Sequence, residues 1–139
     1  MGTEENKALM QRYYDEVWGK GNLSVSAQMV AQDVVDHMLA PGQGAGLAGH
    51  DAMVSMIATA FPDRKFKTNH LIAEGDKVVG HWTMTATHKG PMMGIPATGK
   101  SVTMGGMDIA RWENGKLVEI WHIEDAVSLL QQLGVIPAM

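Results

Sequence analysis

The sequence contains no cysteine, which excludes disulfide bonds, thiolate nucleophiles and thiolate metal sites. It also lacks a basic surface, because its net charge is −4 and its lysines and arginines are scattered. Nucleic acids and anionic membranes are therefore not expected as partners. No apolar run has the length of a membrane span, and the polar, acidic first residues do not resemble a secretory signal. We expect a cytoplasmic protein.

What the chain does contain is typical of a globular protein. Its 139 residues, 45% apolar and 19% charged, predict one domain over residues 1–139 with a single core. The unusual counts are 12 methionines and 16 glycines against two phenylalanines and two tyrosines. Because methionine fills irregular gaps and adapts to ligands, the sequence predicts either a methionine-rich core or a methionine-lined pocket.

The first half of the chain has helical periodicity. Apolar residues from Met10 to Trp18 recur at the spacing of one helix face, and Asn22 is a candidate N-cap for the next helix. Pro62 ends a third helical stretch. The predicted elements are helices over residues 10–18, 23–30 and 53–61, a strand over 34–39, and a glycine-rich loop over 41–49.

The second half reads as strands. Turn signals at residues 74–77 and 113–116 separate four β-type segments and predict two hairpins. The segments are residues 65–73, 77–88, 101–113 and 116–125, followed by a short helix over 126–133. Helices followed by a meander of strands predict the α+β class, with helices on one face of an antiparallel sheet.

The last hairpin carries the titratable residues that we expect to do chemistry. Asp108, His122 and Asp125 stand among residues that would otherwise make an apolar core. An ionisable group without a partner is costly to bury, and perturbed acids and bases gather at functional sites. A carboxylate near His122 would raise its pKa and orient its ring, and such a pair can move protons. The alternative is a core histidine that a neighbouring carboxylate satisfies.

The turn of this hairpin decides whether the pair can form. With a two-residue Asn114-Gly115 turn, Asp108 and His122 would lie on opposite faces of the sheet. With a three-residue turn that includes Glu113, they would share one face and lie diagonally across adjacent strands. We favour the three-residue turn, because it gathers the titratable groups into one apolar patch.

The other histidines are weaker candidates. Asp36 and His37 are adjacent in a strand, so only one of them can point into a pocket. His70 and His81 would pair if Gly75-Asp76 is a two-residue turn, but no metal-binding spacing accompanies them, and we predict no metal. The two remaining histidines, His50 and His88, are expected at the surface.

Several stretches together resemble the SnoaL-like polyketide cyclase family, whose members are often described as ester cyclases. They span nearly the whole chain in the expected order: Asp36 and His37, residues 60–63, 73–78, 87–90 and 93–99, Arg111, residues 114–116 and 118–121, Asp125, and residues 129–134. The resemblance implies the nuclear-transport-factor-2-like, cystatin-like α+β barrel. In that fold a curved antiparallel sheet and N-terminal helices form a cone around a deep apolar pocket. It also implies a homodimer formed through the outer sheet face.

The resemblance further implies acid–base chemistry without a cofactor. In the family's cyclases a carboxylate on the last strand helps to form an enolate, which closes a ring by intramolecular aldol condensation. By motif position that residue corresponds to His122, and its usual histidine partner corresponds to Asp108, so the two residue types are exchanged here. Asp36 matches a polar pocket position, and Asp125 matches an acidic residue frequent in the family.

Three functions follow as hypotheses. The first is a small lyase, cyclase or isomerase that acts on an apolar, carbonyl-bearing small molecule; dehydration and hydrolysis suit a histidine base as well. The second is a binding module without catalysis, and the third is a stress-related domain with a vestigial pocket. The predicted catalytic residues are His122, Asp108 and Asp36. The predicted substrate-binding residues are His37, Trp82, Met84, Met92, Met93, Met104, Ile120 and Asp125.

Overall fold

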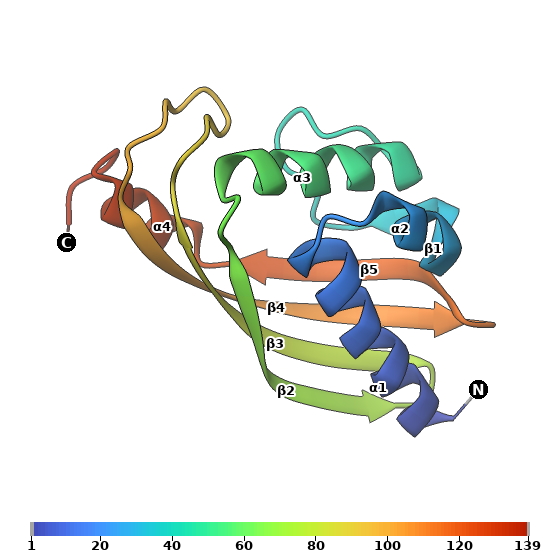
Figure 1. Ribbon diagram of the computed structural model, residues 1–139. Helices are drawn as coiled ribbons and strands as arrows, with labels where there is room; N and C mark the ends of the chain where they lie inside the picture. Colours follow the sequence, from blue (N-terminus) through green and yellow to red (C-terminus); the bar gives the residue numbers. More distant parts are fainter. Residues whose placement is uncertain (1, 139) are drawn as a thin grey trace.

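The computed structural model describes residues 2–138. Five strands form one sheet in the order β1-β5-β4-β3-β2, and helices cover its concave face (Figure 1). The sheet curls around these helices, and its two end strands are not paired with each other, so it does not close into a barrel. The predicted α+β class and cone-shaped fold are confirmed.

The N-terminal helix changes its geometry part-way. α1 (Thr3–Arg12) continues without a break into a π-helical segment, η1 (Tyr13–Gly19). The wider π turn departs from the 3.6-residue period that the sequence pattern assumes. Tyr13 and Tyr14 are neighbours in sequence, yet both are buried, with 1% and 4% of their surface exposed. This segment therefore directs two consecutive tyrosines into the interior.

The predicted second helix and first strand are shifted. α2 (Leu23–Met29) begins where predicted, and the Asn22 side chain caps it by accepting a hydrogen bond from the Val25 amide. It ends one residue early because β1 (Val30–Asp36) starts at Val30 rather than at Val34. β1 pairs in parallel with β5, so the sheet is mixed rather than wholly antiparallel. This pairing covers the edge of β5 that the hairpin leaves open.

The third helix reaches back into the predicted loop. α3 (Gly46–Ala60) includes the last residues of the glycine-rich stretch 41–49, so the prediction of an irregular segment there was wrong in part. A side chain at Gly49 would place its Cβ 1.7 Å from the carbonyl oxygen of Gly44. Gly49 thus allows a close approach of two backbones and does not interrupt the helix.

The two hairpins form as predicted, but the second has a different turn. β2 (Lys65–Glu74) and β3 (Lys77–Thr87) join through the two-residue Gly75-Asp76 turn. β4 (Ser101–Glu113) and β5 (Lys116–Glu124) join through a two-residue turn as well, and its residues Asn114 and Gly115 have φ angles of 52° and 79°. Positive φ at both positions is typical of a type I′ turn. The predicted three-residue turn was therefore wrong.

The chain ends in the short helix α4 (Ala126–Leu133), which packs near one end of β4. Its N-cap is Asp125, which accepts a hydrogen bond from the Ser128 amide. Its C-cap is Gly134, at a φ of 77°. No helix in residues 2–138 is long and apolar enough to cross a membrane.

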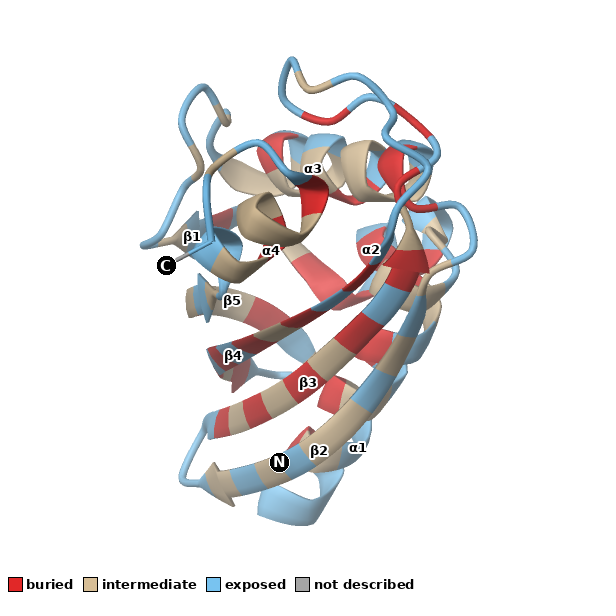
Figure 2. Cartoon of the chain, turned by 90° about the vertical axis from the view of Figure 1, so that its left-hand side faces the viewer, coloured by how far each residue is buried: buried red, intermediate tan, exposed pale blue. Residues whose placement is uncertain are grey.

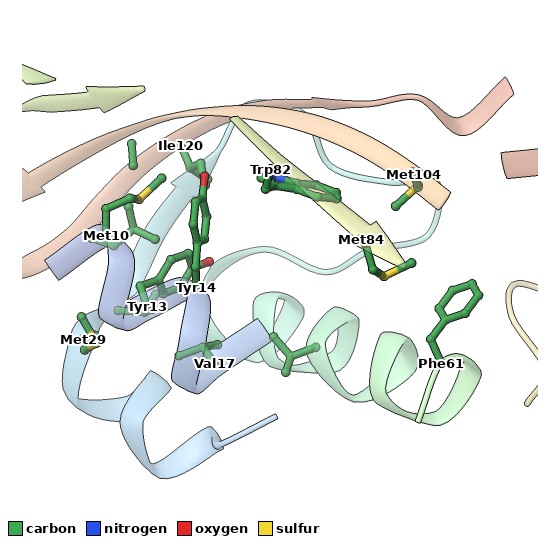
Figure 3. Close-up of a cluster of buried hydrophobic side chains, with 14 of the residues drawn as sticks. Met10, Tyr13, Tyr14, Val17, Met29, Phe61, Trp82, Met84, Met104 and Ile120 are labelled. Carbon is green, nitrogen blue, oxygen red and sulfur yellow. The ribbon is translucent and has the colours of Figure 1, made fainter. Parts of the chain in front are cut away.

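Side chains fill the space between the sheet and the helices. Buried and exposed residues alternate along β3 and β4, so one face of each strand points into this interior (Figure 2). Figure 3 shows Tyr13 and Tyr14 near Met10 at one end of the core, with Met84, Met104 and Phe61 at the other. Within residues 2–138 the buried methionines are Met10, Met29, Met84, Met92 and Met104. The structure therefore shows a methionine-rich core.

Candidate functional site

Asp108 and His122 lie directly opposite each other on β4 and β5, on the concave face of the sheet. The two-residue turn alone would have put them on opposite faces. The strand register shifts, however, between Arg111 and Trp112, where β5 contains one extra residue, Val118. Because of this β-bulge, the side chains of β5 after Val118 point to the opposite face from the one that the turn alone would give them. The predicted juxtaposition is confirmed, but a bulge produces it, and the two residues are direct rather than diagonal neighbours.

Asp108 is held by two buried donors. The Tyr14 hydroxyl donates to its Oδ2 at 2.5 Å, and the Trp82 indole N–H donates to the same oxygen at 3.0 Å. Burial raises the pKa of Asp108 to about 6, although the hydrogen bond from Tyr14 offsets part of that rise. Burial and the charge of Asp108 raise the pKa of Tyr14, so its hydroxyl keeps its proton. Asp108 is therefore a fixed carboxylate that titrates near neutral pH.

Two glycines make room for these donors. A Cβ at Gly80, which lies opposite Asp108 on β3, would be 2.0 Å from the Tyr14 hydroxyl oxygen. A Cβ at Gly106, opposite Trp82 on β4, would be 2.2 Å from the indole ring. Glycine inside a strand often marks such a close approach. The sequence signal was two glycines in otherwise apolar strands, and the sequence analysis did not use it.

His122 lies between two other carboxylates. Its Nε2 is 3.0 Å from both oxygens of Asp36, and its Nδ1 is 2.6 Å from Glu124 Oε1. Burial lowers the pKa of His122, but the hydrogen bonds and charges of Asp36 and Glu124 outweigh it and raise this pKa to about 10. Burial likewise raises the pKa of Asp36, yet hydrogen bonds from His122 and the Met38 amide bring it below its usual value. His122 is thus an imidazolium at neutral pH.

The predicted role of His122 as a base does not fit this charge state. A histidine that is already protonated can donate a proton or stabilise a negative charge, but it cannot accept another proton. Among the grouped residues, Asp108 has the pKa that suits a general base. Glu124 was not among the predicted site residues, although it stands two positions after His122 on the same strand and therefore on the same face.

The site opens in the direction of Glu124. Asp108 is 8% exposed, whereas the side chains of His122 and Glu124 are 19% and 36% exposed. Ligand atoms of these three residues all lie within 4.8 Å of one another. The 2.6 Å contact between His122 and Glu124 is shorter than the roughly 3 Å that separates two ligand atoms on one metal ion. In this arrangement the His122 imidazole and the Glu124 carboxylate share a proton. A metal ion that bound both groups would have to move them apart.

A second polar cluster is buried beside the first. His50 Nε2 lies 2.8 Å from the Tyr13 hydroxyl, and its Nδ1 lies 3.0 Å from Asp51. The Trp18 indole N–H and the Ser26 hydroxyl complete the cluster by donating to Tyr13 and Asp51. Burial lowers the pKa of His50, so the ring stays neutral. The prediction that His50 lies at the surface was wrong, because α3, to which it belongs, packs against η1.

The predicted substrate-binding residues divide into two groups. Those that point into the core are Trp82, Met84, Met92, Met104 and Ile120, each at most 8% exposed.

Three others point away from the interior. His37 contacts Glu119 and stacks on Trp121 at a centroid distance of 4.6 Å, Met93 is 57% exposed, and Asp125 caps α4. The structure does not place these three with the Asp108–His122 cluster.

The surface hollows lie away from the cluster. Two hollows in residues 2–138 have volumes of about 370 and 550 Å³ and are open to solvent. One lies around residues 85–87 and 101–103, and the other around Val35, Arg111 and Val118. The methionine and aromatic side chains of the core lie in the interior in which a deep pocket was predicted. His88 is fully buried at the end of this core, which corrects its predicted surface position.

These features place the titratable residues of the last hairpin inside the concave face of a SnoaL-like fold. A sequence model of the SnoaL-like polyketide cyclases matches residues 8–133. The chain belongs to the SnoaL-like polyketide cyclase family. No curated protein matches the sequence. The family supports an enzyme of the cyclase or isomerase type that binds a small molecule.

Several solved structures have a similar fold. TsrD from Streptomyces laurentii is 25% identical, with a TM-score of 0.88 over 98% of this chain and 99% of its own. AclR from Streptomyces galilaeus, a proposed hydroxylase, is 29% identical, with a TM-score of 0.86 over 99% and 86% of the two chains. A proposed polyketide cyclase from Acidithiobacillus ferrooxidans is 31% identical, with a TM-score of 0.82 over 97% and 99%.

Proposed function

We propose that the protein is a cofactor-independent acid–base enzyme that removes a proton next to a carbonyl group of an apolar small molecule. The resulting enolate would close a ring by intramolecular aldol addition in a polyketide-like or ester-like substrate, which makes the enzyme a lyase or cyclase. One observation carries the proposal. A buried carboxylate with a pKa of about 6 lies directly opposite an imidazolium with a pKa of about 10.

Asp108 is the base in this proposal. Its Oδ2 accepts both hydrogen bonds from Tyr14 and Trp82, so the other oxygen, Oδ1, remains to take the proton from carbon. The substrate carbonyl would displace Glu124, the most exposed member of the cluster, from Nδ1 of His122. The imidazolium then stabilises the charge that develops on the enolate oxygen. After ring closure, His122 protonates the new alkoxide, while Asp36 keeps the ring in place.

The substrate would bind against the apolar side of the core. Met84, Met92 and Met104 lie there, and the flexible side chain of methionine can move aside for a ligand. Met92 is held by two backbone hydrogen bonds with Ile95 in the loop between β3 and β4. We propose that this loop covers the ligand, with Met92 on its inner side and Met93 on its outer side.

Hydrogen–deuterium exchange tests the proposal without knowledge of the natural substrate. The probe is 2-tetralone, a bicyclic enolisable ketone, and its α-proton loss in D₂O is followed by NMR. The protein should accelerate the exchange, and Asp108→Asn should slow it by about 100-fold or more, the usual contribution of a general base. The matched control is Asp33→Asn, which changes an exposed carboxylate on β1. Equal rates for Asp108→Asn and wild type would contradict the proposal.

The same experiment separates the competing function. If 2-tetralone binds and perturbs the NMR signals of Trp82 without any accelerated exchange, the protein is a binding module rather than an enzyme. The indole N–H of Trp82 is a suitable reporter, because it donates to Asp108 and lies in the core.

We also propose a homodimer in the cytoplasm. The outer faces of β4 and β5 carry Ile109 and Ile123, which are 40% and 68% exposed, with Arg111 and Glu119 beside them. An apolar patch with a charged rim is typical of a self-complementary interface. Ile123→Glu should shift the mass measured by sedimentation equilibrium from two chains to one. Val127→Glu, at a 51% exposed position on α4, should leave the mass unchanged.

A further inference from the structure

Two histidines meet on the outer face of the sheet, on the side opposite to Asp108 and His122. His70 on β2 and His81 on β3 are directly paired, and their Nδ1 atoms are 3.0 Å apart. The ring planes differ by 11°, and the ring centroids are 5.3 Å apart, which equals the nitrogen separation plus two ring radii. The rings therefore lie edge to edge in nearly one plane, with the two nitrogens facing each other.

In this contact the two Nδ1 atoms share a single proton. One Nδ1 donates its N–H to the lone pair of the other, and neither ring has a further hydrogen bond within residues 2–138. His70 is exposed and His81 is half-buried, so solvent and solutes reach the pair. An imidazole nitrogen with a free lone pair is the commonest protein ligand of transition metals. An ion can therefore replace the proton once both rings turn outward so that their Nδ1 lone pairs converge on it.

The spacing of the nitrogens is compatible with two ligands of one copper ion. With metal–nitrogen bonds of about 2.0–2.1 Å, a separation of 3.0 Å corresponds to an angle of roughly 90–100° at the ion. Such an angle fits adjacent corners of the square-planar or tetragonal geometry of Cu²⁺. Cu²⁺ also has the highest affinity of the divalent first-row ions for nitrogen ligands.

A third ligand is available on the next strand. Met107 on β4 lies opposite His81 in the ladder and is 55% exposed. Side chains at directly opposed positions have Cβ atoms about 5 Å apart, which brings the thioether within reach of an ion held by the histidines. Neighbouring positions of the same face, Ile72 and Val79, are apolar, and no carboxylate belongs to the row. Two imidazoles and a thioether favour copper over magnesium or calcium.

We propose that His70 and His81 form a copper site on the outer face of the sheet, with Met107 as a third ligand. The site is independent of the proposed acid–base chemistry, because it lies on the other face of the sheet. An ion there would link the edge strand β2 to β3. Since only the folded chain holds the two imidazoles together, the ion should bind it more tightly than the unfolded chain and raise the melting temperature.

Titration of the full chain with CuSO₄ tests the site, with calorimetry for affinity and electron paramagnetic resonance for the ligands. We expect one Cu²⁺ per chain, a spectrum with nitrogen ligands, and a higher melting temperature. His70→Ala and His81→Ala should each weaken binding by at least roughly 10- to 100-fold, the loss that follows even from removing a partner of a metal ligand. Circular dichroism would confirm that both variants fold.

A matched control uses another exposed histidine. His37→Ala should bind Cu²⁺ as tightly as the wild type, because His37 is already engaged by Glu119 and Trp121. Met107→Leu should weaken binding of Cu⁺, which prefers thioether ligands, more than binding of Cu²⁺. Unchanged Cu²⁺ affinity in both His70→Ala and His81→Ala would overturn the proposal, as would equal loss of affinity in His37→Ala.

Discussion

The Tyr14 hydroxyl donates a hydrogen bond of 2.5 Å to Asp108 across the interior of the protein, 94 positions away in sequence. Two departures from regular structure allow this contact. Tyr14 reaches the core from the π-helical segment, and Gly80 leaves the space that the hydroxyl occupies. Because the bond favours the ionised form of Asp108, it sets how basic this carboxylate can be.

Removing the Tyr14 hydroxyl should raise the pKa of Asp108. In Tyr14→Phe the carboxylate loses its first donor and keeps only Trp82, so the pH at which activity rises should move upward from about 6. A shift of roughly one unit corresponds to the loss of one hydrogen bond to a charged group. The pH dependence of ketone exchange measures it. Tyr13→Phe, which breaks a contact with His50 instead, should leave the rise near pH 6; the same shift in both variants would contradict the assignment.

Adjacent glycines on β4 should respond very differently to alanine. Gly106→Ala puts a Cβ 2.2 Å from the Trp82 ring and should force the indole away from Asp108, at a cost of about 1–3 kcal/mol in the free energy of unfolding. Gly105→Ala has its nearest neighbour at 3.8 Å and should be close to neutral. Urea unfolding of the two variants provides the comparison. Equal destabilisation would show that residue 106 has room for a side chain.

The exchange rate should have a bell-shaped pH dependence. Activity requires an ionised Asp108 and a protonated His122, so it should rise through about pH 6 and fall through about pH 10. If His122 acted as the base instead, activity would rise as His122 lost its proton. Activity that requires the loss of a proton from His122 would therefore contradict the roles proposed for the two residues.

Protonated His122 should also stabilise the fold over a defined pH range. Its pKa is about 10 in the folded protein and 6.5 when unperturbed, so the folded state binds the proton more tightly. This contribution is fully present below pH 6.5 and is lost as the pH rises through 10. His122→Gln should lower the free energy of unfolding by about 2 kcal/mol at pH 7, the scale of hydrogen bonds to charged groups.

The measurement for His122→Gln is the difference from wild type in urea unfolding at several pH values. Lysines and tyrosines titrate alike in both proteins, so their contributions cancel in the difference. The difference should shrink steadily between pH 7 and pH 10.5. A constant difference across that range would mean that the charge of His122 does not contribute.

The sequence was sufficient for most elements because their signals are local. Alternating apolar residues predicted β3 and β4, Asn22 predicted its helix cap, and a two-residue Gly75-Asp76 turn predicted the pairing of His70 with His81. Such patterns depend on backbone geometry within a few residues. The same local pattern placed Tyr13 and Tyr14 on one buried helix face, which the structure confirms, but it did not predict that this segment is a π-helix.

The site itself depended on contacts between distant segments. Asp108 and His122 were correctly chosen as buried titratable residues in apolar strands, and the predicted three-residue turn was wrong, yet the bulge at Val118 restored the shared face. A bulge of one residue leaves no clear mark in sequence, because it changes the phase of a ladder rather than the composition of a strand. Asp36 was predicted as a site residue, but its contact with His122 became visible only in the folded chain, as did the partners Tyr14 and Glu124.

The amino-acid sequence by itself determined the family, the α+β class and the strand pair that carries the titratable residues. Only the tertiary structure decided their protonation. The carboxylates of Asp36 and Glu124 meet His122 and keep it charged, whereas burial against Tyr14 and Trp82 leaves Asp108 able to accept a proton near neutral pH. The physical reason is that a pKa depends on solvent exclusion and on charges a few ångströms away, and folding alone brings those groups together.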